Sequence, residues 1–183
     1  MINTITHMKI NLFKLIIIIV YLISPGSVYS IEHPNLKNII FHKEPKKLDN
    51  IEFKNSKNEI IKISDFKNKL IILNFWATWC LPCREEMPSL DNLSNNPEFK
   101  NLQIFPINVG SEKITKSKEF FYEYKIKNLQ IYQDNNLNLP KQLLLRGIPT
   151  TLLINKDGDE FARILGAVDF SDKKLIRWLA TYD

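Results

Sequence analysis

Residues 73–88 read LNFWATWCLPCREEMP, and this stretch decides the fold. It holds the two cysteines of the chain, Cys80 and Cys83, which are separated by two residues. The apolar run that leads into it, Leu70–Phe75, is typical of a strand covered on both faces. After the second cysteine, apolar residues recur at helical spacing, namely Met87, Leu90 and Leu93. The pattern therefore predicts a cysteine pair between the end of a buried strand and the start of a helix.

A cysteine at the start of a helix has distinctive chemistry. The free N–H groups and the positive end of the helix dipole stabilise a thiolate there, so the thiol pKa falls from about 8.5 into the range of roughly 3.5 to 7.5. We expect Cys80 to be the exposed nucleophile and Cys83, inside the first turn, to be the shielded resolving thiol. Pro82 has no N–H to lose in that turn and fixes the backbone between the two sulfurs.

Other uses of the cysteine pair are less favoured. A structural disulfide across four residues closes a very short loop, which adds little stability by the entropy argument. A zinc site needs four ligands, and the further candidates, His7, His33 and His42, lie outside the expected domain. Reduced cysteines used only for packing do not suit an exported protein, because its thiols meet an oxidising compartment.

The N-terminus has the three parts of an export signal. Lys9 and Lys14 lead into the apolar run Leu15–Ile23, and a cleavage-like triplet ends at Ser30. The run is shorter than the roughly 20 apolar residues of a membrane-spanning helix, so we expect cleavage after Ser30 in preference to an uncleaved membrane tether. The absence of cysteine from this segment excludes a lipoprotein anchor. These features predict a periplasmic protein.

Three parts of the chain are expected: a signal peptide or membrane anchor over residues 1–30, a linker over 31–50 and a domain over 51–183. Pro34, Pro45 and mixed charges without periodicity indicate the linker. In the remainder, strand-like and helix-like runs alternate, and the turn at residues 156–159 joins two strands that should pair antiparallel. The expected fold class is α/β, with a mixed central sheet and helices on both faces.

Charge gives little support for nucleic-acid binding. Beyond residue 30, twenty-three basic side chains stand against twenty acidic ones. The lysines are scattered among acids instead of forming a basic stripe with interleaved aromatics.

Residues 73–88 resemble the active-site segment of membrane-associated thioredoxin-like proteins of the ResA/TlpA type. Further matching segments bring the resemblance to about residues 51–183, and these are Ile63–Phe66, Gly147–Thr151 and Asn155–Gly158. The resemblance implies a thioredoxin-like fold with a cis peptide at Ile148–Pro149 beside the cysteine pair. A substrate peptide could add there as a strand, so we expect Trp79, Ile148 and Pro149 to form the substrate-binding surface, with Trp79 partly exposed and shielding the disulfide.

Two departures from related proteins are informative. Cytosolic thioredoxins usually have a buried Asp where this chain has Asn74, which cannot take up a proton. Glu86 lies on the helical face of Cys83 and matches a Glu of ResA-type proteins. We expect Glu86 to be desolvated against Trp76 or Trp79, with a raised pKa, and to exchange a proton with Cys83.

The second departure separates subfamilies. The cytochrome-maturation branch called CcmG or DsbE usually has Pro-Glu-Thr in the loop where Thr150 follows Pro149 here, so the ResA/TlpA branch fits better. Glu85 and Arg84 are expected to be surface charges. Pro88 should kink the active-site helix one turn past Cys83.

The predicted function is an exported thiol–disulfide oxidoreductase that reduces client disulfides through Cys80 and Cys83, without a cofactor or a bound metal. The resemblance implies a membrane electron donor of the CcdA or DsbD type, and clients in cytochrome c maturation or copper-site assembly. The alternative is a copper-handling thiol protein of the same fold, for which Met87 is the only soft residue close in sequence. A peroxiredoxin-type peroxidase is less favoured, because no cysteine in a Thr/Pro-containing loop precedes Cys80.

Overall fold

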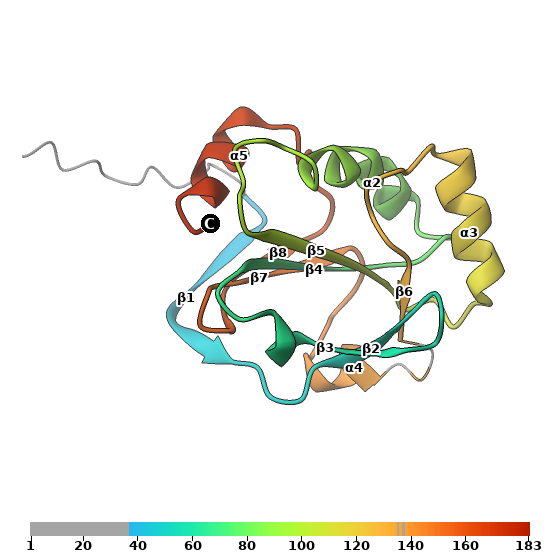
Figure 1. The fold of residues 1–183 in the computed structure, drawn as a ribbon, viewed down its shortest axis with the longest axis horizontal. Coiled ribbons are helices and arrows are strands. Elements are labelled where there is room, and N and C mark those ends of the chain that lie inside the picture. Colours follow the sequence, from blue (N-terminus) through green and yellow to red (C-terminus); the bar gives the residue numbers. More distant parts are fainter. Residues whose placement is uncertain (1–36, 135, 137) are drawn as a thin grey trace, which may run out of the picture. The chain divides into compact units, whose positions relative to one another are not determined.

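An eight-stranded mixed sheet forms the centre of this computed structural model, which describes residues 37–134, 136 and 138–183 (Figure 1). The strand order is β1-β8-β7-β4-β5-β6-β2-β3. The strands β4, β5 and β6 are parallel to one another, and every other neighbouring pair is antiparallel. The strands are β1 (Ile39–Lys47), β2 (Glu52–Asn55), β3 (Ile60–Lys62), β4 (Leu70–Trp76), β5 (Leu102–Asn108), β6 (Tyr132–Gln133), β7 (Thr150–Ile154) and β8 (Asp159–Leu165).

Helices lie on both sides of this sheet, as the sequence predicted. Figure 1 shows α2, α3 and α5 on one side and α4 with η1 on the other. The helices are α2 (Leu81–Leu93), α3 (Ile114–Glu123), α4 (Asn138–Gln142), α5 (Lys173–Ala180) and the 3-10 helix η1 (Ile63–Phe66). The expected α/β class with a mixed sheet is confirmed. The export signal and residues 31–36 of the expected linker lie outside the described residues.

Strand β4 explains why the sheet is covered on both faces. All seven of its residues are buried, and successive side chains of a strand point to opposite faces. One set, Leu70, Ile72 and Trp76, joins the core beneath α2, α3 and α5. The other set, Ile71, Leu73 and Phe75, joins a second core with residues of η1 and α4. A strand with two apolar faces needs this layered arrangement, and its end delivers the chain into the cysteine segment.

Strand β1 corrects the expected linker over residues 31–50. Ile39–Lys47 pairs antiparallel with β8 at the edge of the sheet, with a register shift between Phe41 and Lys46. An edge strand needs few buried side chains and tolerates Pro45 where the pairing is irregular, so its sequence carries no strong period. The prediction of an irregular segment was therefore wrong for this stretch.

Two of the smaller elements are short, namely β6 with two residues and α4 with five. The antiparallel pair β7–β8 is confirmed. The cap of α5 is Asp172, whose carboxylate accepts hydrogen bonds from two backbone N–H groups of the first turn.

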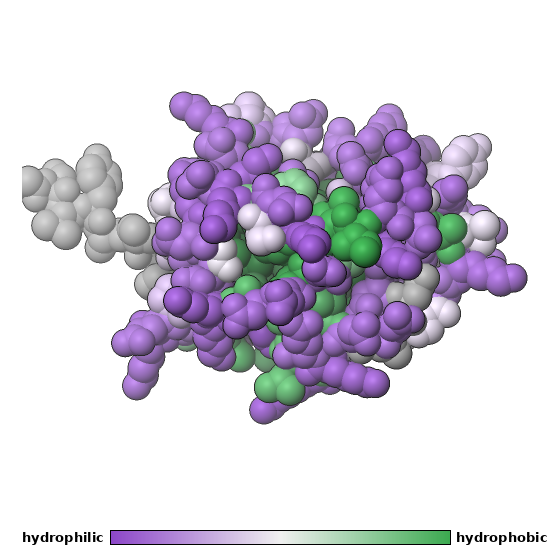
Figure 2. All heavy atoms as spheres, turned by 60° about the horizontal axis from the view of Figure 1, so that its bottom comes forward, coloured by the Kyte–Doolittle hydropathy of each residue, from purple (hydrophilic) through white to green (hydrophobic). Residues whose placement is uncertain are grey.

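The surface on the α4 side is mainly hydrophilic, with apolar areas reaching it near the centre of the view (Figure 2). Among the described residues, no helix has the length and apolar character that crossing a membrane requires.

Candidate active site

The cysteine pair lies where β4 passes into α2. Cys80 is the N-cap of α2 and has an extended backbone, and its Sγ accepts a hydrogen bond of 3.3 Å from the backbone N–H of Cys83. Pro82 occupies the first turn, where a missing N–H costs nothing. The two cysteines form a disulfide with a Cα–Cα distance of 5.3 Å. The predicted placement of both sulfurs at a helix N-terminus is confirmed.

The two sulfurs are less accessible than the sequence suggested. Cys83 is fully buried, as expected, but Cys80 is only 5% exposed in the disulfide state. The prediction of an exposed Cys80 was therefore wrong for this state, because the flanking chain and the cis-proline loop cover it. The exposed side chains beside it are apolar, namely Trp79 at 67% and Leu81 at 63%.

The loop before β7 lies against Cys80. The Ile148–Pro149 peptide bond is cis, as predicted. The carbonyl oxygen of Ile148 lies 3.7 Å from Cys80 Sγ. The loop is anchored because the carbonyl of Pro149 accepts a hydrogen bond of 2.8 Å from the N–H of Gly166, and Thr150 Oγ1 donates to the carbonyl of Gly147. Backbone of the cis loop is thus held against the disulfide.

A hollow of about 260 Å³ opens beside this loop. Its lining is mainly apolar and comes from three separate parts of the chain: Trp79, Val109, Pro140, Leu145, Arg146, Gly147 and Ile148. Two of the three expected substrate-binding residues, Trp79 and Ile148, face this hollow. The third, Pro149, is buried and is not among the residues that line the hollow.

Glu86 is a buried carboxylate on the same helix. It is 3% exposed. Its Oε1 accepts a hydrogen bond of 2.8 Å from Asn74 Nδ2, and its Oε2 accepts one of 3.1 Å from the N–H of Val168. Burial raises the pKa of Glu86 from 4.5 to about 7, although both hydrogen bonds lower it. The expected desolvation is confirmed, and the polar partners come from β4 and the β8–α5 loop.

The two charged residues before Glu86 on α2, Arg84 and Glu85, differ in their contacts. Glu85 is exposed, as expected. Arg84 is more engaged than a plain surface charge, because its guanidinium donates two hydrogen bonds, of 2.6 and 2.9 Å, to the hydroxyl of Tyr124. It also lies 5.2 Å from the centre of that ring. Arg84 thus ties α2 to the end of α3. Pro88 lies inside α2.

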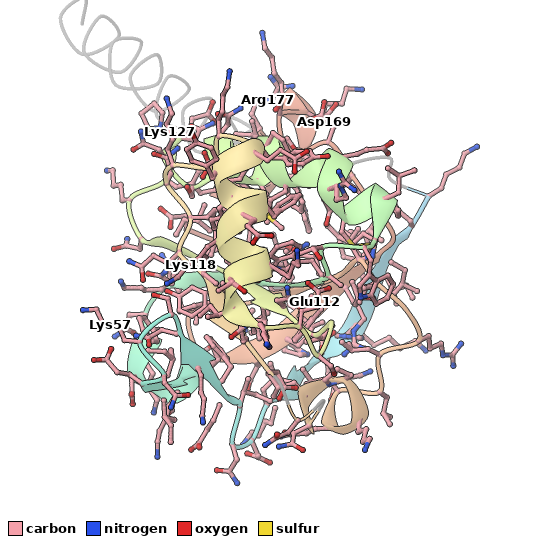
Figure 3. All side chains as sticks on the ribbon, turned by 90° about the vertical axis from the view of Figure 1, so that its right-hand side faces the viewer. Lys57, Glu112, Lys118, Lys127, Asp169 and Arg177 are labelled. Atoms are coloured by element: carbon pink, nitrogen blue, oxygen red, sulfur yellow. A yellow bond between two sulfur atoms is a disulfide. The ribbon has the colours of Figure 1, made fainter. Side chains whose placement is uncertain are left out.

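Sequence reasoning missed a carboxylate that supports the segment before the cysteines. Thr78 Oγ1 donates a hydrogen bond of 2.5 Å to Glu112 Oε2. Glu112 precedes the first turn of α3, as Figure 3 shows. No periodic pattern marks such a contact, since it joins two loops far apart in the sequence. Gly110 is one sequence signal of this contact, because a Cβ at that position would lie 2.5 Å from Glu112 Oε1.

Two features bear on metal binding. Within the described residues, no group of three or more His, Cys, Asp or Glu side chains is placed to hold a metal ion. Met87, the soft residue close in sequence, is fully buried.

The comparison with protein families decides the relationship. The family model described as AhpC/TSA matches residues 45–159, which is more than half of the chain. The chain belongs to the AhpC/TSA family. The matched range holds β4, both cysteines, Glu86 and the cis-proline loop. The geometry described above is therefore that of an AhpC/TSA member with a disulfide at the start of α2.

Curated relatives of this AhpC/TSA member carry a consistent name. The chain is 30% identical over 119 residues to the thiol-disulfide oxidoreductase ResA of Bacillus subtilis, and the match covers 65% of each chain. It is 34% identical over 106 residues to ResA of a Bacillus cereus strain, covering 58% of this chain and 60% of that one. The chain thus matches less than two thirds of the length of these relatives. The resemblance to ResA-type proteins inferred from the sequence is confirmed.

Solved structures agree on the fold. A DsbF homologue from Corynebacterium diphtheriae is 25% identical, with a TM-score of 0.67, and the match covers 81% of this chain and 95% of that chain. A secreted thiol-disulfide isomerase from Corynebacterium glutamicum is 23% identical with the same TM-score, covering 80% and 94%. The latter supports the thioredoxin-like fold alone.

Proposed function

We propose that this chain is an exported thiol–disulfide oxidoreductase that reduces the disulfides of client proteins. The observation that carries the proposal is the position of Cys80, whose Sγ caps α2 and lies against the carbonyl of Ile148. A thiolate at that place is stabilised by backbone N–H groups and the helix dipole. The names of the ResA relatives support the same chemistry.

The reaction is a two-step exchange. In the reduced protein, the thiolate of Cys80 attacks one sulfur of the client disulfide, forms a mixed disulfide and releases the other client sulfur as a thiolate. The thiolate of Cys83 then attacks Cys80 Sγ and releases the second client sulfur. The client gains two electrons, and the protein ends with the Cys80–Cys83 disulfide found in this structure.

Glu86 is the proposed proton carrier for Cys83. The neighbouring Asn74 has no proton to exchange, whereas a carboxyl with a pKa of about 7 can hold or release a proton near neutral pH. Its position on α2, three residues after Cys83, places it on the same face of the helix. Glu86 would take the Cys83 proton when that thiol must attack and return it when the protein is reduced again.

The client would bind at the surface beside Cys80. Trp79 and Ile148 face the apolar hollow, and an extended client segment would pair with the backbone of the cis loop. The proposed setting is the periplasm, with the first thirty residues acting as a cleaved signal in preference to a tether. A membrane donor of the CcdA or DsbD type would supply electrons, and apocytochrome c or a copper-site protein would receive them.

Turnover of a model disulfide tests the proposal. The full-length chain should accelerate the reduction of insulin by dithiothreitol. Cys80→Ser should abolish the acceleration because the attacking sulfur is gone. Cys83→Ser should instead accumulate mixed disulfides, visible by mass spectrometry, because nothing displaces the client. Unchanged activity in Cys80→Ser would overturn the proposed function.

A further inference from the structure

A second hollow adjoins the one beside Cys80. It has a volume of about 480 Å³ and lies between β1, β8 and the chain that follows α4. Arg146 lines both hollows, so they meet at that side chain. The second hollow is lined by Ile40, His42, Lys46, Lys47, Leu48, Gln142, Leu143, Leu144, Arg146, Glu160, Arg163 and Leu165. A client segment that binds beside Cys80 and extends past Arg146 would reach the second hollow.

The charge of this second hollow is positive. Lys46, Lys47 and Arg146 are exposed, and no ion pair involves them anywhere in the described part of the chain. Glu160 is the one acidic residue among the described lining residues, and it is 1% exposed. Both oxygens of its carboxylate are hydrogen-bonded beneath the surface, so it offsets little of the positive charge of the exposed side chains.

The partners of Glu160 show why. Its Oε1 lies 2.9 Å from His42 Nε2, and both of its oxygens accept hydrogen bonds from Arg163, of 2.8 and 2.9 Å. Burial alone would raise the pKa of Glu160, but these contacts hold it below its usual value. The buried acid thus balances Arg163, and the exposed lysines form no ion pair with any described residue.

The chain between α4 and the cis loop presents an exposed apolar side chain, Leu144, to the second hollow. Leu144 is 79% exposed and has a φ of 52°, a left-handed conformation that a bulky side chain rarely adopts. Arg163 Nη1 donates a hydrogen bond of 2.9 Å to the carbonyl of the preceding Leu143. This contact ties the backbone that precedes Leu144 to β8.

We infer that the second hollow is a groove, bordered by Leu144, Arg146, Lys46 and Lys47, that receives an acidic segment of the client polypeptide. The inference rests on the proposed function, because it assigns a substrate class to the same site. The client would place apolar residues beside its cysteine, against Trp79 and Ile148, and acidic residues farther along the chain. Complementary charge of this kind raises the rate of encounter and selects among partners.

The test uses disulfide-linked dimers of short cysteine peptides. Both peptides carry leucines beside the cysteine, and one continues with three Asp and the other with three Lys. The reduced full-length chain is mixed with each, and its oxidation is followed by quenched alkylation and mass spectrometry. At low salt the acidic dimer should react about tenfold faster, and the ratio should fall toward one in about 1 M salt, where the screening length is only about 3 Å.

Matched charge reversals locate the effect. Lys46→Glu combined with Lys47→Glu should reduce the acidic-to-basic ratio to about one or below. Lys57→Glu combined with Lys118→Glu changes the net charge equally and should keep the wild-type ratio. Figure 3 shows Lys57 and Lys118 on the side of the molecule away from β1. Equal ratios in the two double variants would overturn the inference.

An uncharged disulfide separates the two proposals. If the reduced chain fails to react with 2-hydroxyethyl disulfide, the proposed function is wrong. If it reacts with that compound but treats the acidic and basic peptides alike, only the groove assignment is wrong. Binding of the wild-type chain to phosphatidylglycerol vesicles that is lost in the Lys46/Lys47 variant, with no peptide preference, would assign the groove to a lipid surface and also overturn the inference.

Discussion

Asn74 Nδ2 donates a 2.8 Å hydrogen bond to Glu86 Oε1, joining the end of β4 to the second turn of α2. The same amide group donates to Thr151 Oγ1 on β7 at 3.0 Å. The amide oxygen of Asn74 is buried and has no partner within the described residues. Asn74 therefore supports the ionised form of Glu86, while burial opposes it, and burial has the larger effect on the pKa.

The stability of the oxidised protein should depend on pH through Glu86. Because its pKa is about 7 in the folded chain and near 4.5 when exposed, the folded protein holds this proton more tightly. The stabilising contribution is complete below pH 4.5 and is lost as pH rises through 7, amounting to roughly 3 kcal/mol. Urea unfolding between pH 4.5 and 8 should show this loss in wild type and a flatter profile in Glu86→Gln. Parallel stability–pH profiles for wild type and Glu86→Gln would contradict this prediction.

Asn74→Ala should raise the Glu86 pKa further. The variant removes a hydrogen bond that lowers this pKa, whereas burial, which raises it, remains. Titration of the Glu86 carboxyl carbon by NMR in the oxidised protein gives the midpoint directly. Asn128→Ala serves as the control, because that amide bonds Asp91 elsewhere on α2. An unchanged Glu86 midpoint in Asn74→Ala would show that the 2.8 Å contact has no influence.

Glu86→Gln should make both thiols easier to ionise in the reduced protein. Removing a negative charge beside Cys83 should lower the apparent cysteine pKa values, and each unit corresponds to about 1.4 kcal/mol. The dependence of the cysteine alkylation rate on pH should therefore be flatter in the variant than in wild type. Glu85→Gln carries the same charge change on an exposed side chain and should follow wild type. Superimposable curves for Glu86→Gln and wild type would identify Glu86 as a carboxylate without influence on the thiols.

The sequence was sufficient for the elements that have strong periodic signals. Leu70–Phe75 was correctly predicted to be a strand buried on both faces, and the helical spacing after Cys83 placed Glu86 on the correct face of α2. The resemblance added the cis peptide at Ile148–Pro149, which local spacing could not supply. These features depend on residues close together in the chain or on one specific motif.

Long-range partners could not be predicted in this way. His42 lies in the domain and contacts Glu160, 118 residues later, although its sequence surroundings indicated a linker. Asn74 was noted for lacking a proton, but its hydrogen bond to Glu86 appears only when β4 and α2 are packed together. The small exposure of Cys80 likewise depends on the distant loop at Ile148. In each case tertiary contacts, which leave no local pattern, decide the environment.

The new boundary of the domain can be tested by truncation. A chain that begins at Asp49 lacks β1, so it loses the strand pairing with β8, the His42–Glu160 contact and the packing of Phe41 against Trp178. It should be less stable than a chain beginning at Lys37 by roughly 2–4 kcal/mol. Urea unfolding of the two chains measures the difference. Equal stabilities would restore the linker interpretation for residues 39–47.

Thr78, Gly110 and Glu112 should behave as one coupled unit. Thr78→Val removes the donor to Glu112 Oε2, whose partner oxygen Oε1 is already buried without a hydrogen bond in the described structure, and should cost about 1–3 kcal/mol. A Cβ at Gly110 would lie 2.5 Å from Glu112 Oε1 and 3.0 Å from the Cβ of Ala77. Gly110→Ala should therefore displace the same carboxylate and break the same contact.

The double variant distinguishes this coupling from two independent defects. If both changes break one contact, the combined loss of unfolding free energy should be smaller than the sum of the single losses, by more than about 0.5 kcal/mol. Thr181→Val, which removes a hydroxyl bonded to the carbonyl of Trp178 at the end of α5, should add fully to Gly110→Ala. Additive losses for Thr78→Val and Gly110→Ala would mean that Glu112 does not connect the two loops. Non-additive losses would identify Glu112 as the residue that holds the segment leading into Cys80.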